Sequence, residues 1–235
     1  MDVILIAGFW LDGSSWRGQV PALEDAGHRV HTPTLPGYAP GDSTDVGLAD
    51  HVRAIVELID DIDGSVVLVG HSGGGAVAWG ATDARPDRVA RVIGVDAFPP
   101  PAGFAINEDL PEVDGLVPFP ADRATYFDDA EFQDFTDDQL GDFIAHAIPV
   151  PARVAKDPLA LSDEARWHVP FTIIATAFPV AMMEKLIEEG HPMTAELIEL
   201  DELAVIELPT SHWPQLTRPD DLAQILVDEV ARVDE

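Results

Sequence analysis

The stretch Val66-Val67-Leu68-Val69-Gly70-His71-Ser72-Gly73-Gly74 decides the fold of this chain. It places the pattern Gly-x-Ser-x-Gly between an apolar run typical of a buried strand and the small-residue run Ala76-Val77-Ala78, which indicates a helix. A serine on such a strand-to-helix turn adopts a strained backbone, and only residues without bulk can flank it closely. The turn lifts the hydroxyl out of the sheet, beside the first N–H groups of the helix. Ser72 is therefore the candidate nucleophile.

A histidine near the end of the sequence is the candidate base. His212 follows the strand-like run Ala204–Leu208 and precedes an amphipathic segment, 220–233, that predicts a final helix. The carboxyl ends of parallel strands meet at one edge of an open α/β sheet, where active sites of such sheets form. We therefore expect His212 to meet Ser72. A lone histidine is more often a hydrogen-bonded loop residue, and only its position relative to the serine favours catalysis.

Strand-like and helical segments alternate along most of the chain. Continuous apolar runs indicate buried strands, and apolar residues at helical spacing separate them. This alternation predicts a parallel sheet with helices on both faces, in one domain that spans residues 1–235. We predict strands at Val3–Ala7, Arg29–Pro33, Val66–Val69, Val89–Val95, Phe171–Thr176 and Ala204–Leu208, and helices at Gln19–Ala26, Gly47–Ile62, 73–84, Thr136–Ala147, Val180–Glu189 and 220–233.

The alternation breaks over residues 98–167. Prolines recur there, beginning with Pro99-Pro100-Pro101, and acidic pairs such as Asp128-Asp129 lie between them. A segment of this length inside a compact domain is usually functional. We predict that it forms a cap or lid inserted in the domain. The alternative is a plain surface excursion.

The composition restricts the partners of the protein. The 235 residues, of which 46% are hydrophobic, suffice for one domain with a sizeable core. A net charge of −30, from 43 acidic and 13 basic residues, disfavours nucleic acid, anionic membranes and anionic substrates. No apolar run reaches the roughly 18 residues of a membrane helix, and no signal-type segment is recognised. We therefore expect a cytoplasmic protein. Its acid-rich, lysine-poor composition suggests, as a hypothesis, adaptation to high salt.

Two further chemistries are disfavoured by the residue types. The chain contains no cysteine, so disulfides, thiolate metal ligands and cysteine nucleophiles are excluded. His146 and His168 have no carboxylate partner at a spacing typical of metal ligands. We expect neither a metal nor a cofactor.

Five segments follow one another in a recognisable order, namely Val3–Trp10, Ser14-Ser15-Trp16, Thr34-Leu35-Pro36-Gly37, Gly70–Gly74 and His212-Trp213-Pro214. Together they resemble the α/β-hydrolase superfamily, and most closely its small esterases and hydroxynitrile-lyase-like members. Their order and spacing match the superfamily over nearly the whole chain. The resemblance implies the α/β-hydrolase fold, with a mostly parallel central sheet, helices on both faces and a cap insertion.

This resemblance implies a serine hydrolase that cleaves small, neutral, rather apolar carboxylic esters through an acyl-enzyme. The serine attacks while the histidine takes its proton and returns it to the leaving group. Two backbone N–H groups bind the oxyanion. The resemblance assigns these to Phe9 and Gly73, with Trp10 as a second candidate beside Phe9. Ala7 stands where relatives commonly carry a histidine that orders this loop, which leaves the support of the oxyanion donors in question.

The third member of the triad is the hardest to assign. Many relatives place the acid after the next-to-last strand, but here Ala177-Phe178-Pro179 follow, and the first carboxylate is Glu184 in a helix. Asp96 ends the strand after the serine helix, a position that certain lipases and dehalogenases of the superfamily use. The resulting chain order of serine, aspartate and histidine is the usual one. We predict Asp96, with a loop-capping role as its alternative and with Glu184 and Asp201 as less favoured acids.

Four residues near the expected site are predicted to line an apolar substrate pocket, namely Trp10, His71, Phe98 and Trp213. Two of them have an alternative role. His71, next to the serine, is more often a packing residue than a second base in such a position. The alternative role of Trp213 is to pack against the neighbouring His212 and hold it in place.

Two other functions stay open from the sequence. Hydroxynitrile lyases use the same serine and histidine without an acyl intermediate, and they tend to carry a lysine near the site. Nothing in the sequence indicates this role for either of the two lysines, Lys156 and Lys185. A ligand receptor that retains the triad and turns over slowly is the second alternative. Each reading implies a small-molecule ligand, and the oligomeric state is not indicated.

Overall fold

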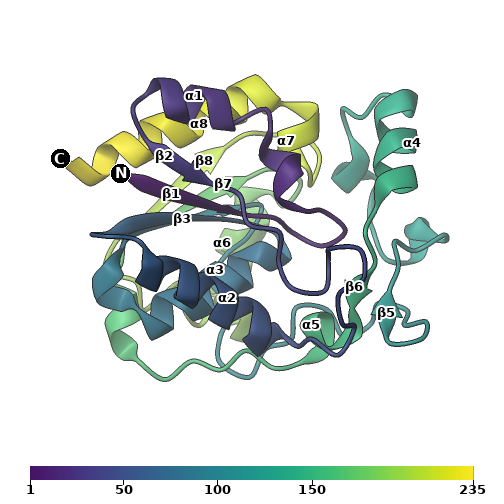
Figure 1. The fold of residues 1–235 in the computed structure, drawn as a ribbon, viewed down its shortest axis with the longest axis horizontal. Helices are drawn as coiled ribbons and strands as arrows, with labels where there is room; N and C mark the ends of the chain where they lie inside the picture. The colour runs from purple at the N-terminus through teal and green to yellow at the C-terminus, as the bar shows by residue number, and fades with distance from the viewer. Residues whose placement is uncertain (235) are drawn as a thin grey trace.

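The computed structural model describes residues 1–234. Its centre is a six-stranded sheet in which every strand is parallel to its neighbours (Figure 1). Parallel strands need a long crossover, and helices or the 98–167 segment supply the connections. In spatial order the strands are β2 (Arg29–His31), β1 (Asp2–Ile6), β3 (Val66–His71), β4 (Val89–Val95), β7 (Phe171–Ala175) and β8 (Leu203–Glu207).

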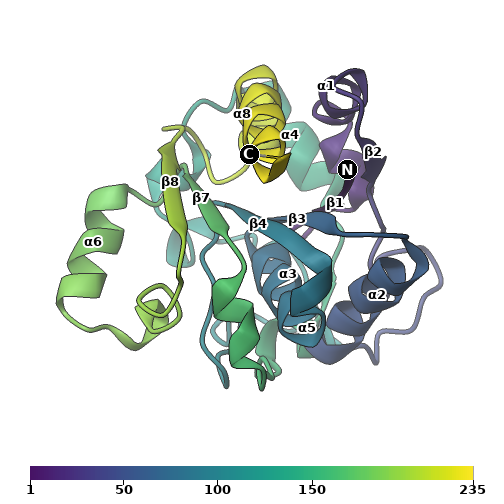
Figure 2. The same cartoon turned by 90° about the vertical axis from the view of Figure 1, so that its left-hand side faces the viewer.

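Two layers of helices cover the two faces of the sheet (Figure 2). One layer contains α1 (Val20–Asp25) and α8 (Pro219–Ala231), and the other contains α2 (Leu48–Asp61) and α3 (Gly73–Ala84). Side chains of β1 alternate between them, as the period of a strand requires. Val3 and Leu5 pack with residues of α1 and α8, whereas Ile4 and Ile6 pack with residues of α2 and α3. This alternation divides the core into two apolar clusters.

The predicted parallel sheet with helices on both faces is confirmed, and every predicted element lies within two residues of its observed bounds. The largest differences have local causes. The second strand ends at His31 instead of Pro33, because proline has no N–H to donate to a neighbouring strand. The last helix ends at Ala231, and a 3₁₀ turn at Arg232–Asp234 continues it.

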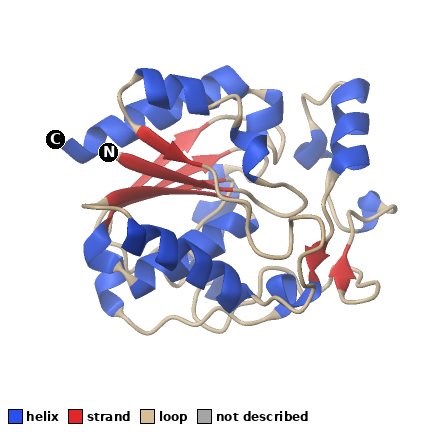
Figure 3. Cartoon of the chain, in the orientation of Figure 1, coloured by secondary structure: helices blue, strands red, loops and turns tan. Residues whose placement is uncertain are grey.

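Residues 98–167, which we call the cap segment, connect β4 to β7. The part around α4 (Asp137–His146) lies beyond the carboxyl ends of the strands, whereas α5 (Ala152–Lys156) lies beside α2 (Figure 1). The carboxyl ends of the strands point toward this segment, and the two chain termini lie at the opposite end of the sheet. In Figure 3, α4 stands apart from the helices that flank the sheet. The cap segment contains β5 (Leu116–Val117), β6 (Val150–Pro151), α4 (Asp137–His146) and α5 (Ala152–Lys156); the remaining helices are α6 (Val180–Glu188) and α7 (Pro214–Thr217).

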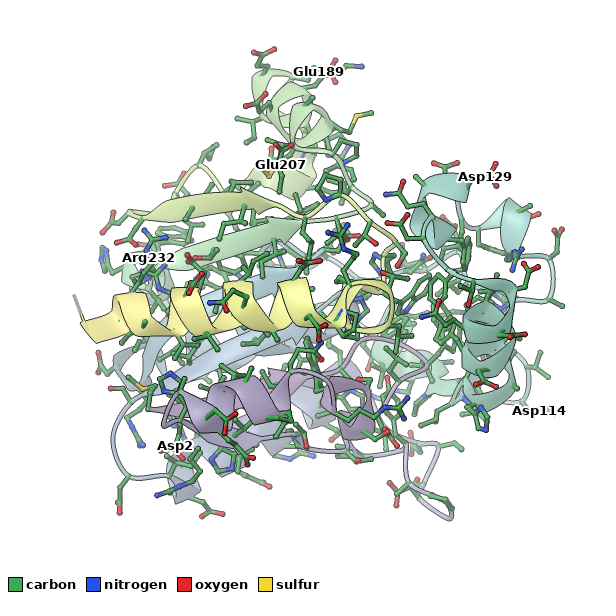
Figure 4. The ribbon with its side chains drawn as sticks, turned by 90° about the horizontal axis from the view of Figure 1, so that it is seen from above. Asp2, Asp114, Asp129, Glu189, Glu207 and Arg232 are labelled. Carbon is green, nitrogen blue, oxygen red and sulfur yellow. The ribbon has the colours of Figure 1, made fainter. Side chains whose placement is uncertain are left out.

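Acidic side chains are spread over the surface (Figure 4). Asp114 and Asp129 lie on the cap segment, Glu189 at the end of α6 and Glu207 on β8, and all four are exposed. The charge is therefore distributed around the molecule instead of forming one patch. Within residues 1–234, no helix is long and apolar enough to cross a membrane.

Candidate active site

Ser72 occupies the turn between β3 and α3 in a conformation that few residues adopt, with φ 51° and ψ −124°. Neighbouring segments lie too close to the turn for side chains. A Cβ on Gly74 would lie 2.6 Å from the carbonyl oxygen of Ile6, and one on Gly8 would lie 2.6 Å from Nδ1 of His71. The glycines therefore allow the first loop of the chain to lie directly against the serine turn.

Three loops bring Ser72, His212 and Asp96 together at the carboxyl edge of the sheet. Nε2 of His212 lies 2.8 Å from Oγ of Ser72, and its Nδ1 lies 2.6 Å from Oδ2 of Asp96. The side chain of His212 is 17% exposed and that of Asp96 is 3% exposed. In this arrangement the imidazole can accept the serine proton while its Nδ1–H donates to the carboxylate.

Asp96 is held in place by the loop that follows β7. It has a positive φ of 45°, and its Oδ1 accepts hydrogen bonds from the backbone N–H groups of Thr176 and Phe178, at 3.0 and 3.3 Å. Burial alone would raise the pKa of this carboxyl. The hydrogen bond and charge of His212, together with the two backbone donors, outweigh burial and lower the pKa below its ordinary value. The carboxylate form is therefore favoured.

The alternative acids do not approach His212. Glu184 is exposed on α6, and Asp201 is paired with His168 at the surface, with 2.7 Å between Oδ2 and Nδ1. The two lysines also have partners elsewhere. Lys156 is bonded to Glu112, and Lys185 lies 3.9 Å from Glu189 one turn along α6.

The first loop contains the predicted oxyanion donors. In the described part of the chain, no protein acceptor is bonded to the backbone N–H of Phe9 or of Gly73, the first residue of α3. The ring of Phe9 covers Gly73, since a Cβ there would meet Cε1 of Phe9 at 2.8 Å and Cγ2 of Ile106, from the cap segment, at 3.5 Å. Trp10 has a positive φ of 63°, which turns the chain away after Phe9. Ala7 is buried and small.

His71 does not lie on a pocket wall, because it is completely buried. Its Nε2 lies 2.7 Å from the carbonyl oxygen of His212, and its Nδ1 lies 3.2 Å from Nε2 of Gln215. Burial lowers the pKa of His71 to about 3, and the charge of His212 adds to this effect. A neutral ring with the proton on Nε2 satisfies both contacts. His71, at the end of β3, therefore links that strand to the backbone of His212.

The three predicted aromatic pocket residues have different surroundings. Trp213 is almost fully buried, and its ring packs edge-on against His212 with 5.0 Å between centroids, so it braces the histidine. Trp10 lines a cavity of about 560 Å³ between α4 and the 3₁₀ turn at Gly13–Trp16. Phe98 lines a small apolar cavity beside Asp96.

Some residues at the site were not found from the sequence. The donors to Asp96 are backbone groups at Thr176 and Phe178, and a backbone N–H has no side-chain signature. Glu131 and Gln133 of the cap segment contact the loop that carries His212, but they lie in a stretch without periodicity. Among residues 1–234, no group of three or more histidine and acidic side chains could hold a metal ion.

Comparisons with known proteins identify the family of this chain. The family model of the alpha/beta hydrolase family matches residues 3–225. A pyrethroid hydrolase of Sphingobium wenxiniae is 28% identical over 97% of this chain and 86% of its own length. A carbendazim hydrolyzing esterase of a Nocardioides species is 36% identical over 47% of this chain and 48% of its own length.

Solved structures show the same fold. An extracellular α/β-hydrolase from a Paenibacillus species superimposes with a TM-score of 0.77 over 97% of this chain and 98% of its own, at 22% identity. Polyneuridine aldehyde esterase superimposes with a TM-score of 0.72 over 97% of this chain and 98% of its own, at 21% identity. Because this family model matches most of its length, the chain belongs to the alpha/beta hydrolase family of enzymes.

Proposed function

We propose that this protein is a serine esterase that cleaves small, neutral, rather apolar carboxylic esters through an acyl-enzyme. The observation that carries the proposal is the unbroken chain of hydrogen-bond distances from Ser72 through His212 to Asp96, 2.8 and 2.6 Å long. A hydroxyl becomes a good nucleophile only when a base removes its proton during attack. The chain of contacts supplies that base and the group that orients it.

The reaction proceeds in two halves. Ser72 attacks the ester carbonyl, its proton passes to Nε2 of His212, and the N–H groups of Phe9 and Gly73 bind the oxyanion. His212 then protonates the leaving alcohol, and the acyl group stays on the serine. Water, deprotonated by the same imidazole, releases the acid and restores the enzyme. Asp96 remains ionised throughout and keeps the imidazole in the required tautomer.

The preference for neutral substrates rests on the charges around the site. The net charge of −30 repels anions, and neither lysine is available near the triad, because Lys156 is engaged with Glu112 and Lys185 lies on α6. Relatives that are named a pyrethroid hydrolase and a carbendazim hydrolyzing esterase support an ester-like apolar substrate. We further propose that the cap segment acts as the lid over this site. Its Ile106 packs beside Gly73 and supports that role.

Hydrolysis of p-nitrophenyl acetate and butyrate tests the proposed function. The wild-type protein should hydrolyse both esters, and Ser72→Ala should lower kcat by about 10⁴-fold or more. Mass spectrometry of the quenched reaction should find the acyl group on the peptide that contains Ser72. Tight binding of these esters with negligible turnover would indicate a receptor instead. Cleavage of a cyanohydrin without any acylated serine would indicate a lyase.

A further inference from the structure

The loop that carries His212, residues Thr210–Trp213, is held from two sides. From the core, Nε2 of His71 donates to the carbonyl oxygen of His212 at 2.7 Å. From the cap segment, the carbonyl oxygen of Glu131 accepts the backbone N–H of His212 at 3.0 Å. Both backbone groups of the histidine are therefore fixed, one by the sheet and one by the cap segment. We call residues 210–213 the histidine loop.

A second bond joins the cap segment to the same loop. Nε2 of Gln133 donates to the carbonyl oxygen of Thr210 at 2.7 Å. Gln133 lies at the surface, but Thr210 and Ser211 are completely buried. Leaving a buried carbonyl without its donor is unfavourable, so the bond from Gln133 favours this position of the loop.

Aromatic packing attaches the histidine loop to the cap segment as well. The ring of Trp213 lies with its centroid 4.8 Å from that of Phe143, 5.4 Å from that of Phe132 and 6.1 Å from that of Phe127. All three phenylalanines belong to the cap segment. Trp213 also packs edge-on against the ring of His212. The cap segment therefore supports His212 in two ways, by a hydrogen bond to its backbone and by packing against Trp213.

We propose that the cap segment positions His212, with Gln133 as a positioning residue that holds the histidine loop within reach of Ser72. Docking of the cap segment then completes the catalytic site as well as covering it. This inference rests on the proposed esterase function, and the experiment below keeps the two apart. It differs from an ordinary lid, because losing the cap contact should slow the chemical step instead of weakening substrate binding.

The cap segment provides a matched control for Gln133. Gln139 is also an exposed glutamine, and its Nε2 donates to the carbonyl oxygen of Leu216 at 3.2 Å, beyond the histidine loop. In addition it accepts a hydrogen bond from the N–H of Thr136 at the start of α4, so its loss removes more contacts than that of Gln133. The test compares Gln133→Met with Gln139→Met, because methionine keeps the length of the side chain and lacks the N–H donor.

For Gln133→Met we expect kcat for p-nitrophenyl acetate to fall by about 10- to 100-fold, the effect of a small displacement of a catalytic group. KM should change by less than about threefold. Gln139→Met should leave both constants near the wild-type values, even if its melting temperature falls further. Gln133→Lys, which restores a donor of sufficient length, should recover most of kcat.

A spectroscopic readout separates positioning from general loosening of the fold. In the wild type, the Nδ1–H of His212 bonded to Asp96 should give a low-field proton resonance that His212→Gln lacks. This resonance should weaken or disappear in Gln133→Met and persist in Gln139→Met. If Gln133→Met does not fold, Gln133→Glu, which has the same shape and no donor, replaces it in both measurements.

Two results would overturn the inference. One is a kcat for Gln133→Met within about twofold of wild type with the low-field resonance intact. The other is an equal loss of kcat in both methionine variants. Failure of the proposed function looks different, because the wild type itself would neither hydrolyse the ester nor react at Ser72 with a fluorophosphonate.

Discussion

At the scale of the residue, the site depends on backbone conformations that few side chains tolerate. Ser72 and Asp96 both have positive φ, 51° and 45°, and each follows the last residue of a buried strand. A carboxylate or hydroxyl at such a position is turned out of the sheet toward its edge. The hydrogen bonds of the surrounding loops maintain this strain, so the geometry of the site is determined by segments far apart in the sequence.

Asp96→Asn tests the assignment of the acid. Asparagine retains the size of the side chain but favours the wrong tautomer of His212, so kcat for p-nitrophenyl acetate should fall by about 10³- to 10⁴-fold. Glu184→Gln and Asp201→Asn are the matched controls, and their kcat should stay near that of the wild type. Full activity of Asp96→Asn would move the acid elsewhere.

His71 should make the protein less stable in acid. In the unfolded chain its ring takes up a proton as the pH falls below about 6.5, whereas burial lowers the folded pKa to about 3. Between these values the unfolded state binds more protons than the folded state. The free energy of unfolding therefore decreases as the pH decreases, by up to about 1.4 kcal/mol per pH unit from this group.

Urea denaturation of the wild type and of His71→Gln at several pH values between 3.5 and 7 measures this contribution. Glutamine keeps an N–H donor for the carbonyl of His212 and does not titrate. The slope against pH should therefore be shallower in the variant over this range. Other groups, including His51, whose pKa burial also lowers, are present in both proteins and cancel in the comparison. Parallel curves would show that folding does not lower the pKa of His71.

At the scale of the element, a buried ionic network ties the end of the cap segment to α3. Arg166 is bonded through Nε and Nη2 to Glu196 and through Nη1 to Asp83 of α3, and its side chain is 6% exposed. The indole N–H groups of Trp79 and Trp167 donate to the same carboxylate of Glu196. The network therefore fixes where the chain leaves the cap segment and enters β7.

Arg166→Met should lower the free energy of unfolding by about 3–5 kcal/mol, because it leaves two buried carboxylates without their cation. Arg53→Met is the control. It removes an arginine of α2 that is 61% exposed and paired with Asp50, a change worth about 0–1 kcal/mol. Urea denaturation of both variants at neutral pH gives the comparison. A loss for Arg166→Met no larger than that for Arg53→Met would contradict the importance of the network.

The sequence predicts best those elements whose pattern of apolar residues indicates which of their faces are buried. Val3, Ile4, Leu5 and Ile6 are apolar on both faces, which indicates a strand buried on both sides. Asp96 was predicted as the acid because it directly follows such a strand, and the structure places its carboxylate 2.6 Å from Nδ1 of His212. The internal contacts of the cap segment were not predictable, because Gln133 bonds to a backbone carbonyl more than seventy residues away and nothing in its neighbourhood indicates that partner. Long-range contacts between irregular segments leave no periodic pattern.

At the scale of the whole molecule, the net charge of −30 should make stability depend on salt. Like charges repel one another most strongly in the compact state, and salt reduces this repulsion because the Debye length falls from about 10 Å at 0.1 M to about 3 Å at 1 M. We expect the melting temperature to rise between 0.05 and 2 M NaCl, by several degrees. A midpoint that stays constant or falls over this range would contradict the hypothesis of adaptation to high salt.

The way in which the β7 loop holds Asp96 affects how homologous sequences should be compared. Thr176 and Phe178 contribute only their main-chain amides, which almost any amino acid provides. Substitutions in that loop can therefore accumulate through evolution while the acid stays anchored. With Asp96 as the proposed acid, an alignment that seeks the carboxylate at the more common position would find Ala177 there, and would wrongly classify this chain, and homologues that share the arrangement, as inactive pseudoenzymes.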